Sequence, residues 1–335
     1  MSLSIVIAPD SFKGTLTARR ASAAMARGWR SARGEDSVIE LPQADGGEGT
    51  LDAIETAITG CIRHRVDGVT GPDGRPVEAT WLELPDGTAV VELAESSGLP
   101  LMRELDPLGA TTRGLGEMLV AALDAGATSL LIALGGSAST DAGIGALEAL
   151  GTRSPPPGGV TLLTDVTAPL LGPNGAAAVF GPQKGASADQ VHELEARLAR
   201  VAGLLGGEPE HPGAGAAGGT AYGLAAVWGA SIASGADYVA ALTGLDHALA
   251  GADVVITGEG RFDAQSMTGK VVGRVLAAAA HRSVVIAGSL AHPPPDAGYS
   301  LSELAGSRDA ALTQPEFWIE RATEIAAREL TQRNR

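Results

Sequence analysis

Residues 254–270 read VVITGEGRFDAQSMTGK, and this stretch frames both the fold and the chemistry of the chain. Val254–Thr257 is a short, mostly apolar run, typical of a strand that is buried on both faces of a parallel sheet. The run continues into the letters GEGR, and we predict a strand that opens onto a charged glycine loop. In α/β sheets, loops of this kind at strand ends bind anionic ligands.

Two nucleotide-binding templates do not fit this stretch. The dinucleotide fingerprint requires a third glycine where the chain has Asp263, and an aspartate there would repel a pyrophosphate. The P-loop requires Ser or Thr after its lysine, but Val271 follows Lys270. The six histidines show no zinc spacing, and one cysteine cannot form a thiolate cluster. The loop therefore indicates anion chemistry without a standard nucleotide motif.

Outside this stretch, apolar runs alternate with helical patterns, which favours βαβ units and parallel sheets. Alternation around Trp81, followed by Pro85–Gly87 and a second apolar run, predicts one antiparallel hairpin within residues 62–95. Ile5–Ala8 is predicted to be a buried strand, and Thr15 or Thr17 can cap a following helix in which Ala21, Met25 and Trp29 share one face. Ser187 and Gln190 form a predicted capping box, Asp237–Ala250 is predicted to be one helix, and Pro315 is expected to begin the last helix. We predict an α/β domain built from both chain ends, residues 1–62 plus 240–335, with an α/β domain of residues 63–239 inserted.

Composition narrows the class of protein. The chain has 335 residues, 44% of them hydrophobic, and a formal net charge of −15. This charge repels nucleic acid and anionic membranes, so neither is an expected partner. The N-terminal residues do not resemble a signal peptide, and no apolar stretch reaches membrane-spanning length. We expect a soluble cytoplasmic protein, either a monomer or a homodimer.

Lysine is scarce and its positions are informative. Of 24 Lys plus Arg residues only three are lysines, and each has a glycine neighbour: Lys13, Lys184 and Lys270. Arg replaces Lys readily on solvated surfaces, but less well where a compact ammonium meets a phosphate oxygen in a tight space. Loops after predicted strands also carry carboxylates, which can hold Mg²⁺ or accept a proton from a hydroxyl. The residues therefore favour phosphoryl transfer, although each loop Asp taken singly also fits a helix cap or a turn.

Six stretches, in this order along the chain, resemble the bacterial two-domain glycerate kinase family. They are IVIAPDSFKGTLTA (5–18), LPQADGGEGT (41–50), LIALGGSASTDAG (131–143), DVTAPLLGPNGAAAVFGPQKGA (165–186), PGAGAAGG (212–219) and residues 254–270. The resemblance implies phosphorylation of D-glycerate by ATP with Mg²⁺, giving 2-phosphoglycerate. It also implies two α/β domains, one flavodoxin-like and one restriction-enzyme-like, one inserted into the other, with an active-site cleft between them.

Candidate roles follow from the matching positions. Asp45 or Asp165 is expected to accept the proton of the glycerate hydroxyl, and Lys13 and Lys270 complete the catalytic candidates. Glu259 and Asp263 are the candidates for Mg²⁺. Lys184 is expected to hold a phosphate or the glycerate carboxylate, and Arg261 is a candidate for that carboxylate. The remaining substrate- and nucleotide-binding candidates are Asp10, Ser11, Gly46, Gly47, Glu48, Gly135, Gly136, Ser137, Asp141, Asn174 and Gln265.

The chain departs from the family pattern at three places. Family members often have Asn at the position of Ala168 and His at the position of Thr268, and a longer segment where this chain has residues 151–164. Two alternatives therefore stay open beside glycerate phosphorylation: a kinase of another small hydroxy acid, and a non-catalytic binding or regulatory relative.

Overall fold

The computed structural model describes residues 2–267, 271–279 and 282–333, and the chain divides into two compact units. The terminal unit contains residues 1–44, 52–59 and 236–335, and the central unit contains residues 45–51 and 60–235. The predicted boundaries placed residues 45–51 with the chain ends. The structure places this short segment in the central unit, because its glycine backbone packs on that unit's strand ends.

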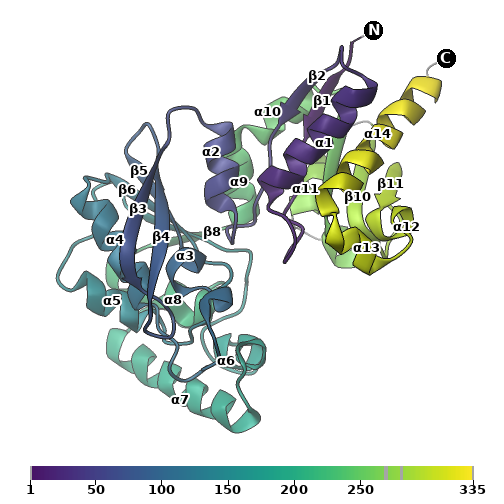
Figure 1. The fold of residues 1–335 in the computed structure, drawn as a ribbon. Coiled ribbons are helices and arrows are strands. Elements are labelled where there is room, and N and C mark those ends of the chain that lie inside the picture. Colours follow the sequence, from purple (N-terminus) through teal and green to yellow (C-terminus); the bar gives the residue numbers. More distant parts are fainter. Residues whose placement is uncertain (1, 268–270, 280–281, 334–335) are drawn as a thin grey trace. The chain divides into compact units, whose positions relative to one another are not determined.

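The terminal unit is built on a parallel five-stranded sheet (Figure 1). Its strands are β1 (Ser4–Ile7), β2 (Ser37–Glu40), β9 (Val254–Phe262), β10 (Ser283–Leu290) and β11 (Ala297–Ser300). They lie in the order β2-β1-β9-β10-β11, and every neighbouring pair is parallel. This is the flavodoxin-like strand order, with its switch point between β1 and β9. The predicted α/β class is confirmed.

Helices cover this sheet. They are α1 (Ala18–Ala32), α2 (Thr50–Ala57), α9 (Gly235–Thr243), α10 (Leu245–Ala250), α11 (Val271–Ala278), α12 (Leu301–Leu304), α13 (Arg308–Thr313) and α14 (Pro315–Arg333), with a 3₁₀ turn at Ala264–Met267. Thr17 caps α1 by accepting the Arg20 N–H, and the predicted stripe of Ala21, Met25 and Trp29 is fully buried.

The central unit has a mixed six-stranded sheet. Its strands are β3 (Ile62–Thr70), β4 (Pro76–Glu83), β5 (Thr88–Glu92), β6 (Ser129–Ala133), β7 (Val160–Leu163) and β8 (Ser231–Ala233), in chain order across the sheet. The pairs β3–β4 and β4–β5 are antiparallel, which confirms the predicted hairpin, and β5 to β8 are parallel. Parallel strands end at one edge, so the loops after β5, β6, β7 and β8 share that edge.

The helices of the central unit are α3 (Leu93–Ser97), α4 (Arg113–Asp124), α5 (Ile144–Leu150), α6 (Ala176–Phe180), α7 (Ala188–Leu205) and α8 (Ala216–Trp228), with 3₁₀ turns at Leu99–Leu101 and Pro182–Lys184. The predicted capping box is confirmed at the start of α7, where Ser187 and Gln190 each bond the backbone of the other. Leu194 and Leu198 of α7 are buried in one apolar cluster with Leu170 and Tyr222.

Two predictions about secondary structure are wrong in detail. The letters GEGR do not form a loop, because β9 continues through them to Phe262. Gly258 serves close packing instead: a Cβ added there would lie 2.0 Å from the carbonyl oxygen of Ile286 in β10. The predicted helix 237–250 is divided into α9 and α10 at Gly244, whose φ of 71° ends a right-handed helix.

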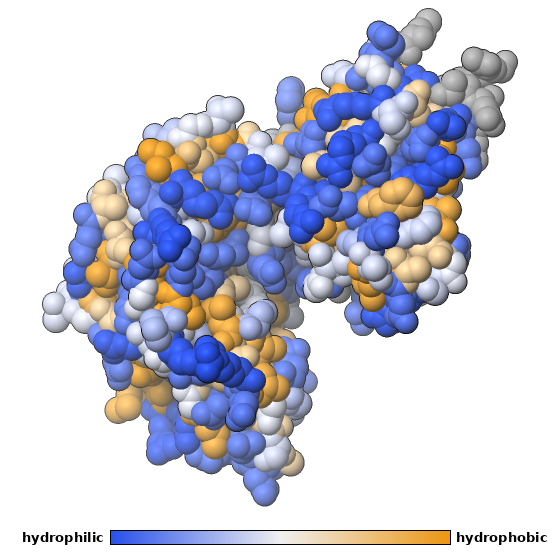
Figure 2. All heavy atoms as spheres, in the orientation of Figure 1, coloured by the Kyte–Doolittle hydropathy of each residue, from blue (hydrophilic) through white to orange (hydrophobic). Residues whose placement is uncertain are grey.

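Polar side chains dominate the visible surface. On the face that Figure 2 shows, hydrophilic residues cover much of both units, and hydrophobic residues lie in small groups between them. Within the described residues, every helix is too short or too polar to cross a membrane.

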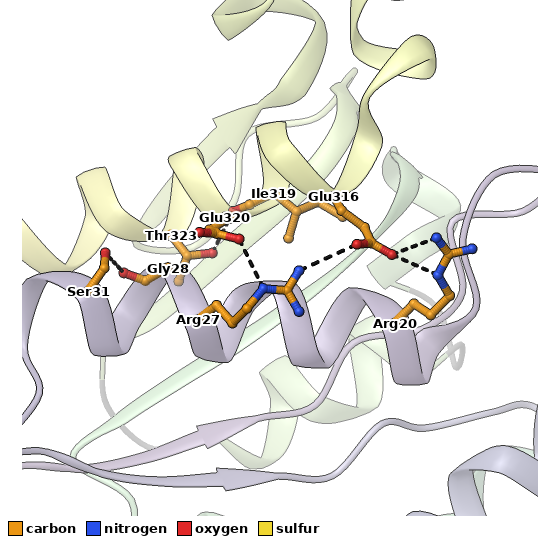
Figure 3. Close-up of polar contacts among 8 residues, drawn as sticks. All are labelled: Arg20, Arg27, Gly28, Ser31, Glu316, Ile319, Glu320 and Thr323. Carbon is orange, nitrogen blue, oxygen red and sulfur yellow. Dashed lines mark hydrogen bonds and ion pairs between the residues drawn. The ribbon is translucent and has the colours of Figure 1, made fainter.

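Helices α1 and α14 lie side by side in the terminal unit, although they come from opposite chain ends (Figure 1). Arg20 and Arg27 of α1 bond Glu316 of α14 at 2.7 and 3.4 Å, and Arg27 also bonds Glu320 at 3.0 Å (Figure 3). These exposed pairs contribute little each. Gly28 sets the approach of the two helices, since an added Cβ would lie 2.1 Å from the Glu320 carbonyl oxygen.

We expect Gly28→Ala to destabilise the terminal unit by about 1–3 kcal/mol, since α14 must move away from the new methyl group. Gly203→Ala is the matched control, because Gly203 lies within α7 and has no heavy atom within 4 Å of an added Cβ. That control should leave stability unchanged or raise it by up to about 1 kcal/mol. Urea unfolding followed by circular dichroism measures both, and an equal loss in the two variants would contradict the role given to Gly28.

Candidate active site

In the terminal unit, the predicted residues gather at the switch point of the sheet. Asp10 follows β1, and its N–H donates to the Gly258 carbonyl of β9 at 2.9 Å. Lys13 is exposed, and a Cβ added to Gly260 would lie 3.6 Å from its backbone nitrogen. The ends of β1 and β9 therefore bring Asp10, Lys13 and Gly260 into one neighbourhood. In flavodoxin-like sheets this is the place where ligands bind.

The residues after Glu259 have their own local contacts. Glu259 is half-buried, while Arg261 is exposed and its Nε lies 3.4 Å from the Asp263 carboxylate. The other oxygen of that carboxylate accepts the Gln265 N–H at 2.9 Å, so Asp263 also caps the 3₁₀ turn that follows. Ser11 donates its N–H to the Asp10 carboxylate at 2.6 Å. Lys270 and Thr268 lie outside the described residues.

In the central unit, residues 45–47 lie against the ends of the parallel strands. Gly135, just beyond β6, donates its N–H to the Gly46 carbonyl at 3.1 Å. A Cβ added to Gly135 would lie 2.4 Å from the Gly47 Cα, and one added to Gly46 would lie 2.9 Å from the Leu163 Cβ. Gly135 is thus required because a Cβ there would collide with the backbone of Gly47, and Gly46 because a Cβ there would crowd Leu163.

The two candidate bases both contact Gly235, which follows β8. The Asp165 carboxylate accepts the Gly235 N–H at 2.9 Å and the Ser234 hydroxyl at 3.0 Å. Gly235 also packs on Asp45, since an added Cβ would lie 2.0 Å from the Asp45 carbonyl oxygen. Asp165 is exposed and Asp45 is half-buried. The structure therefore brings together two residues that are far apart in the chain.

Asp141 serves the fold. Its carboxylate accepts the Thr112 N–H at 2.9 Å and the Thr112 hydroxyl at 2.7 Å, and also the N–H groups of Gly143 and Gly145 at 3.1 and 3.2 Å. Together these bonds tie the start of α4 to the start of α5. The predicted residues Glu48, Gly136 and Asn174 are exposed.

Lys184 occupies a different environment from Lys13. Its side chain is buried, and Nζ donates to the Ser137 hydroxyl at 2.9 Å and to the Ser139 carbonyl at 2.5 Å. Burial lowers the pKa of Lys184 to about 8, and the Asp141 charge opposes this shift. The predicted residues Ser137 and Lys184 are therefore direct neighbours.

Sequence reasoning missed three residues at this edge. Glu92, the last residue of β5, is buried and accepts the Leu51 N–H at 2.6 Å, which anchors segment 45–51. We looked for carboxylates in the loops that follow predicted strands. The same search, extended to the last residue of each strand, would have found Glu92. Ser234 and Gly235 were missed because β8 has only three residues and gives no periodic signal.

No group of three or more His, Cys, Asp or Glu side chains in the described parts of the chain is arranged to hold a metal ion by itself. Any metal held there would need ligands from a substrate or water as well, as Mg²⁺ does when it binds with nucleotide phosphates.

The comparisons with known proteins show the family of this chain. The model of the glycerate kinase family matches residues 5–156 and 157–331. This chain belongs to the glycerate kinase family. It is 39% identical to "Glycerate 2-kinase" of Escherichia coli K12, with 86% of each chain covered. It is 41% identical to "Glycerate kinase" of Bacillus subtilis 168, with 85% of this chain and 84% of the relative covered.

A crystal structure from Salmonella typhimurium LT2, assigned as a glycerate kinase 2, has the same fold. It superposes with a TM-score of 0.82 at 33% identity, and all of both chains is covered. The family resemblance found in the six stretches is thereby confirmed, and so is the predicted class of two α/β units.

The pKa of Lys184 has a consequence for stability. Between pH 8 and the ordinary lysine value of 10.5, the unfolded chain binds a proton at Lys184 that the folded chain has largely released. The free energy of unfolding should therefore rise with pH across this window. We expect wild type to gain stability relative to Lys184→Met as pH increases, measured by urea unfolding at several pH values. A difference that stays constant or shrinks would contradict the buried state of this lysine.

Proposed function

We propose that this protein is a glycerate kinase, which transfers the γ-phosphoryl group of ATP to D-glycerate and forms 2-phosphoglycerate. One observation carries the proposal: residues 45–47 lie against the ends of the parallel strands of the central unit, beside Gly135 and Asp165. The family pattern includes these residues, and they also lie at the carboxyl ends of parallel strands, where α/β sheets bind ligands. Membership of the family over nearly the whole chain supports the reaction class.

Asp165 is the preferred base, with Asp45 as the alternative. The Asp165 carboxylate is held in place by the Gly235 N–H and the Ser234 hydroxyl. A carboxylate has about four lone-pair sites, so an oriented carboxylate still has capacity to accept the proton of a substrate hydroxyl. Fixing its direction beforehand lowers the entropy cost of the proton transfer.

Cationic side chains are proposed to hold the anionic groups of the substrates. Lys13 is exposed beside the switch point and suits a phosphate oxygen. Lys270 is proposed for the same role on the strength of the family pattern. Arg261 is exposed and presents a guanidinium that can bind a carboxylate through two bonds, although the Asp263 carboxylate lies 3.4 Å away.

Mg²⁺ is proposed as the metal that accompanies ATP. Glu259, half-buried on β9, is proposed to hold it together with Asp263, whose carboxylate also accepts a backbone N–H and lies next to Arg261. When bound, Mg²⁺ would supply positive charge that offsets the negative charge developing on the transferred phosphoryl group. Asp263 would act on it through water.

The alternative substrate is another small hydroxy acid, and the observation that favours it is the short connection of residues 151–159 between α5 and β7. We further propose that the protein works in the cytoplasm as a monomer or homodimer, with ATP and D-glycerate as its small-molecule partners. We propose no nucleic-acid partner, because a chain of net charge −15 repels nucleic acid.

The activity is tested by ADP release from purified protein with ATP, Mg²⁺ and D-glycerate, beside a panel of small hydroxy acids. We expect D-glycerate to give the highest kcat/KM, and direct coupling to enolase to consume the product without a mutase. Turnover of another hydroxy acid but not of D-glycerate would show that the other acid is the substrate. Binding of ATP without turnover of any acid would favour a non-catalytic relative. A product that enolase does not consume would contradict phosphorylation at the 2-hydroxyl.

The role of Asp165 is tested by Asp165→Asn. The amide oxygen can still accept the Gly235 N–H, so the loop is retained while the base is lost. We expect kcat to fall by about 10²–10⁴-fold, the usual contribution of a general base. Asp189→Asn, at an exposed position in the first turn of α7, is the control and should retain activity. If Asp165→Asn retains full activity and Asp45→Asn does not, the base is Asp45.

A further inference from the structure

Lys184 does not present its ammonium to the surroundings. It ends the 3₁₀ turn Pro182–Lys184, and only 3% of the residue is exposed. Its two hydrogen bonds go to Ser137 and Ser139, which lie in the loop after β6. A buried lysine that bonds two points of one loop fixes the shape of that loop. This differs from the expectation that Lys184 holds a phosphate or the glycerate carboxylate.

The bond to Ser137 also determines the direction of the serine hydroxyl. An ammonium has only donors, so the Ser137 oxygen must be the acceptor in the contact of 2.9 Å. The hydroxyl hydrogen of Ser137 then has to point away from Lys184, toward another acceptor. The structure provides none among the described residues, because the only hydrogen bond of the Ser137 side chain is the one from Lys184.

The neighbouring backbone supports a bound anion at this place. Ser137 follows Gly136, whose φ of 79° turns the chain. The backbone hydrogen bonds of the described loop employ the N–H groups of Gly135 and Ala138, whereas those of Gly136 and Ser137 are not used. Consecutive N–H groups in such a turn form an anion-binding concavity. The hydroxyl and the two N–H groups therefore form a set of unused donors in the loop.

One charged group influences Lys184. The Asp141 carboxylate favours its ammonium form electrostatically, but accepts its own hydrogen bonds from Thr112, Gly143 and Gly145. Asp141 thus holds the far end of the same loop while Lys184 holds the middle. A positive charge next to the Ser137 oxygen also makes its hydroxyl a stronger donor.

We propose that Lys184 is a positioning residue: it directs the Ser137 hydroxyl and its loop toward an anionic oxygen of the bound substrate, and does not touch the substrate itself. The acceptor is a phosphoryl or carboxylate oxygen, the two anionic groups that the reaction brings in. This inference rests on the proposed function.

A double-mutant cycle tests it, with Ser137→Ala, Lys184→Met and the double variant assayed for ADP release with D-glycerate. If Lys184 acts through Ser137, each single variant should have kcat/KM lowered by about 10–100-fold, through the same parameter, either a lower kcat or a higher KM. The kcat/KM of the double variant should be no lower than that of the worse single variant. If Lys184 touched the substrate, the two losses would multiply, and the positioning role would be wrong. Gln183→Ala, an exposed neighbour on the same turn, is the control and should keep wild-type kinetics.

A second measurement covers the case in which Lys184→Met does not fold. The chain has three lysines, so protein labelled with ¹³C-lysine gives three side-chain signals, and the Lys184 signal is the one that remains in both Lys13→Arg and Lys270→Arg. In Ser137→Ala the pKa of Lys184 should fall below about 8, because the ammonium has lost an acceptor. In wild type, saturation with ATP–Mg²⁺ and with D-glycerate should change the Lys184 pKa by less than about one pH unit from its value without ligand. A direct bond from Lys184 to a phosphate or carboxylate would raise that pKa by more than this.

The outcomes separate the two proposals. Wild-type protein without kinase activity would contradict the proposed function and with it the substrate contact of Ser137. Active wild-type protein with multiplicative losses, or with a Lys184 pKa that rises strongly on substrate binding, would contradict the positioning role alone.

Discussion

The candidate site of the central unit depends on contacts in which no Cβ fits. Gly47 and Gly135 place their backbones against each other, and Gly235 places its backbone against Asp45. Each contact lets the chain that bears Asp45 come to the end of a strand that is distant in sequence. Glu92 adds one bond that anchors the end of the same segment at Leu51. A side chain at Gly135 or Gly235 should therefore shift carboxylates as well as lower stability, because the backbone that must move also bears Asp45.

Each unit uses the same geometric rule with a different sheet. In the terminal unit the order β2-β1-β9-β10-β11 creates a switch point, and the candidate residues come from the strands on its two sides. In the central unit the parallel strands run in chain order, so there is no switch point among β5 to β8. There the segment 45–51, which comes from an earlier part of the chain, places candidate residues at the strand ends, as the switch point does in the terminal unit. This explains why a short segment belongs to the central unit although its chain neighbours do not.

Local signals in the sequence predicted the local structure well. The apolar run at residues 5–8, a cap at Thr15 or Thr17 and the capping box of Ser187 with Gln190 need only near neighbours. The structure has all three, with Thr17 as the cap. Failures occurred where distant contacts decide the backbone. Helix α8 begins within a glycine stretch, with Ala217 at a φ of 52° and Gly218 against the Ser139 carbonyl, and no periodic pattern indicates such a start. Gly258 looked like a turn residue, but the partner that requires it is Ile286 of β10.

The three lysines illustrate how far composition can be taken. Because lysines are scarce in this chain, each lysine marks a position where arginine is disfavoured. Proximity to a phosphate is one reason why arginine can be disfavoured. Lys13 is compatible with that reason because it is exposed beside the switch point. Lys184 has another reason: a guanidinium is larger and cannot lose its charge, so it does not fit a site that is 3% exposed and offers two acceptors. A buried site and a phosphate contact can thus both favour lysine over arginine. At position 184 the two reasons are distinguished by the hydrogen-bond partner Ser137, which is 47 positions away in the chain.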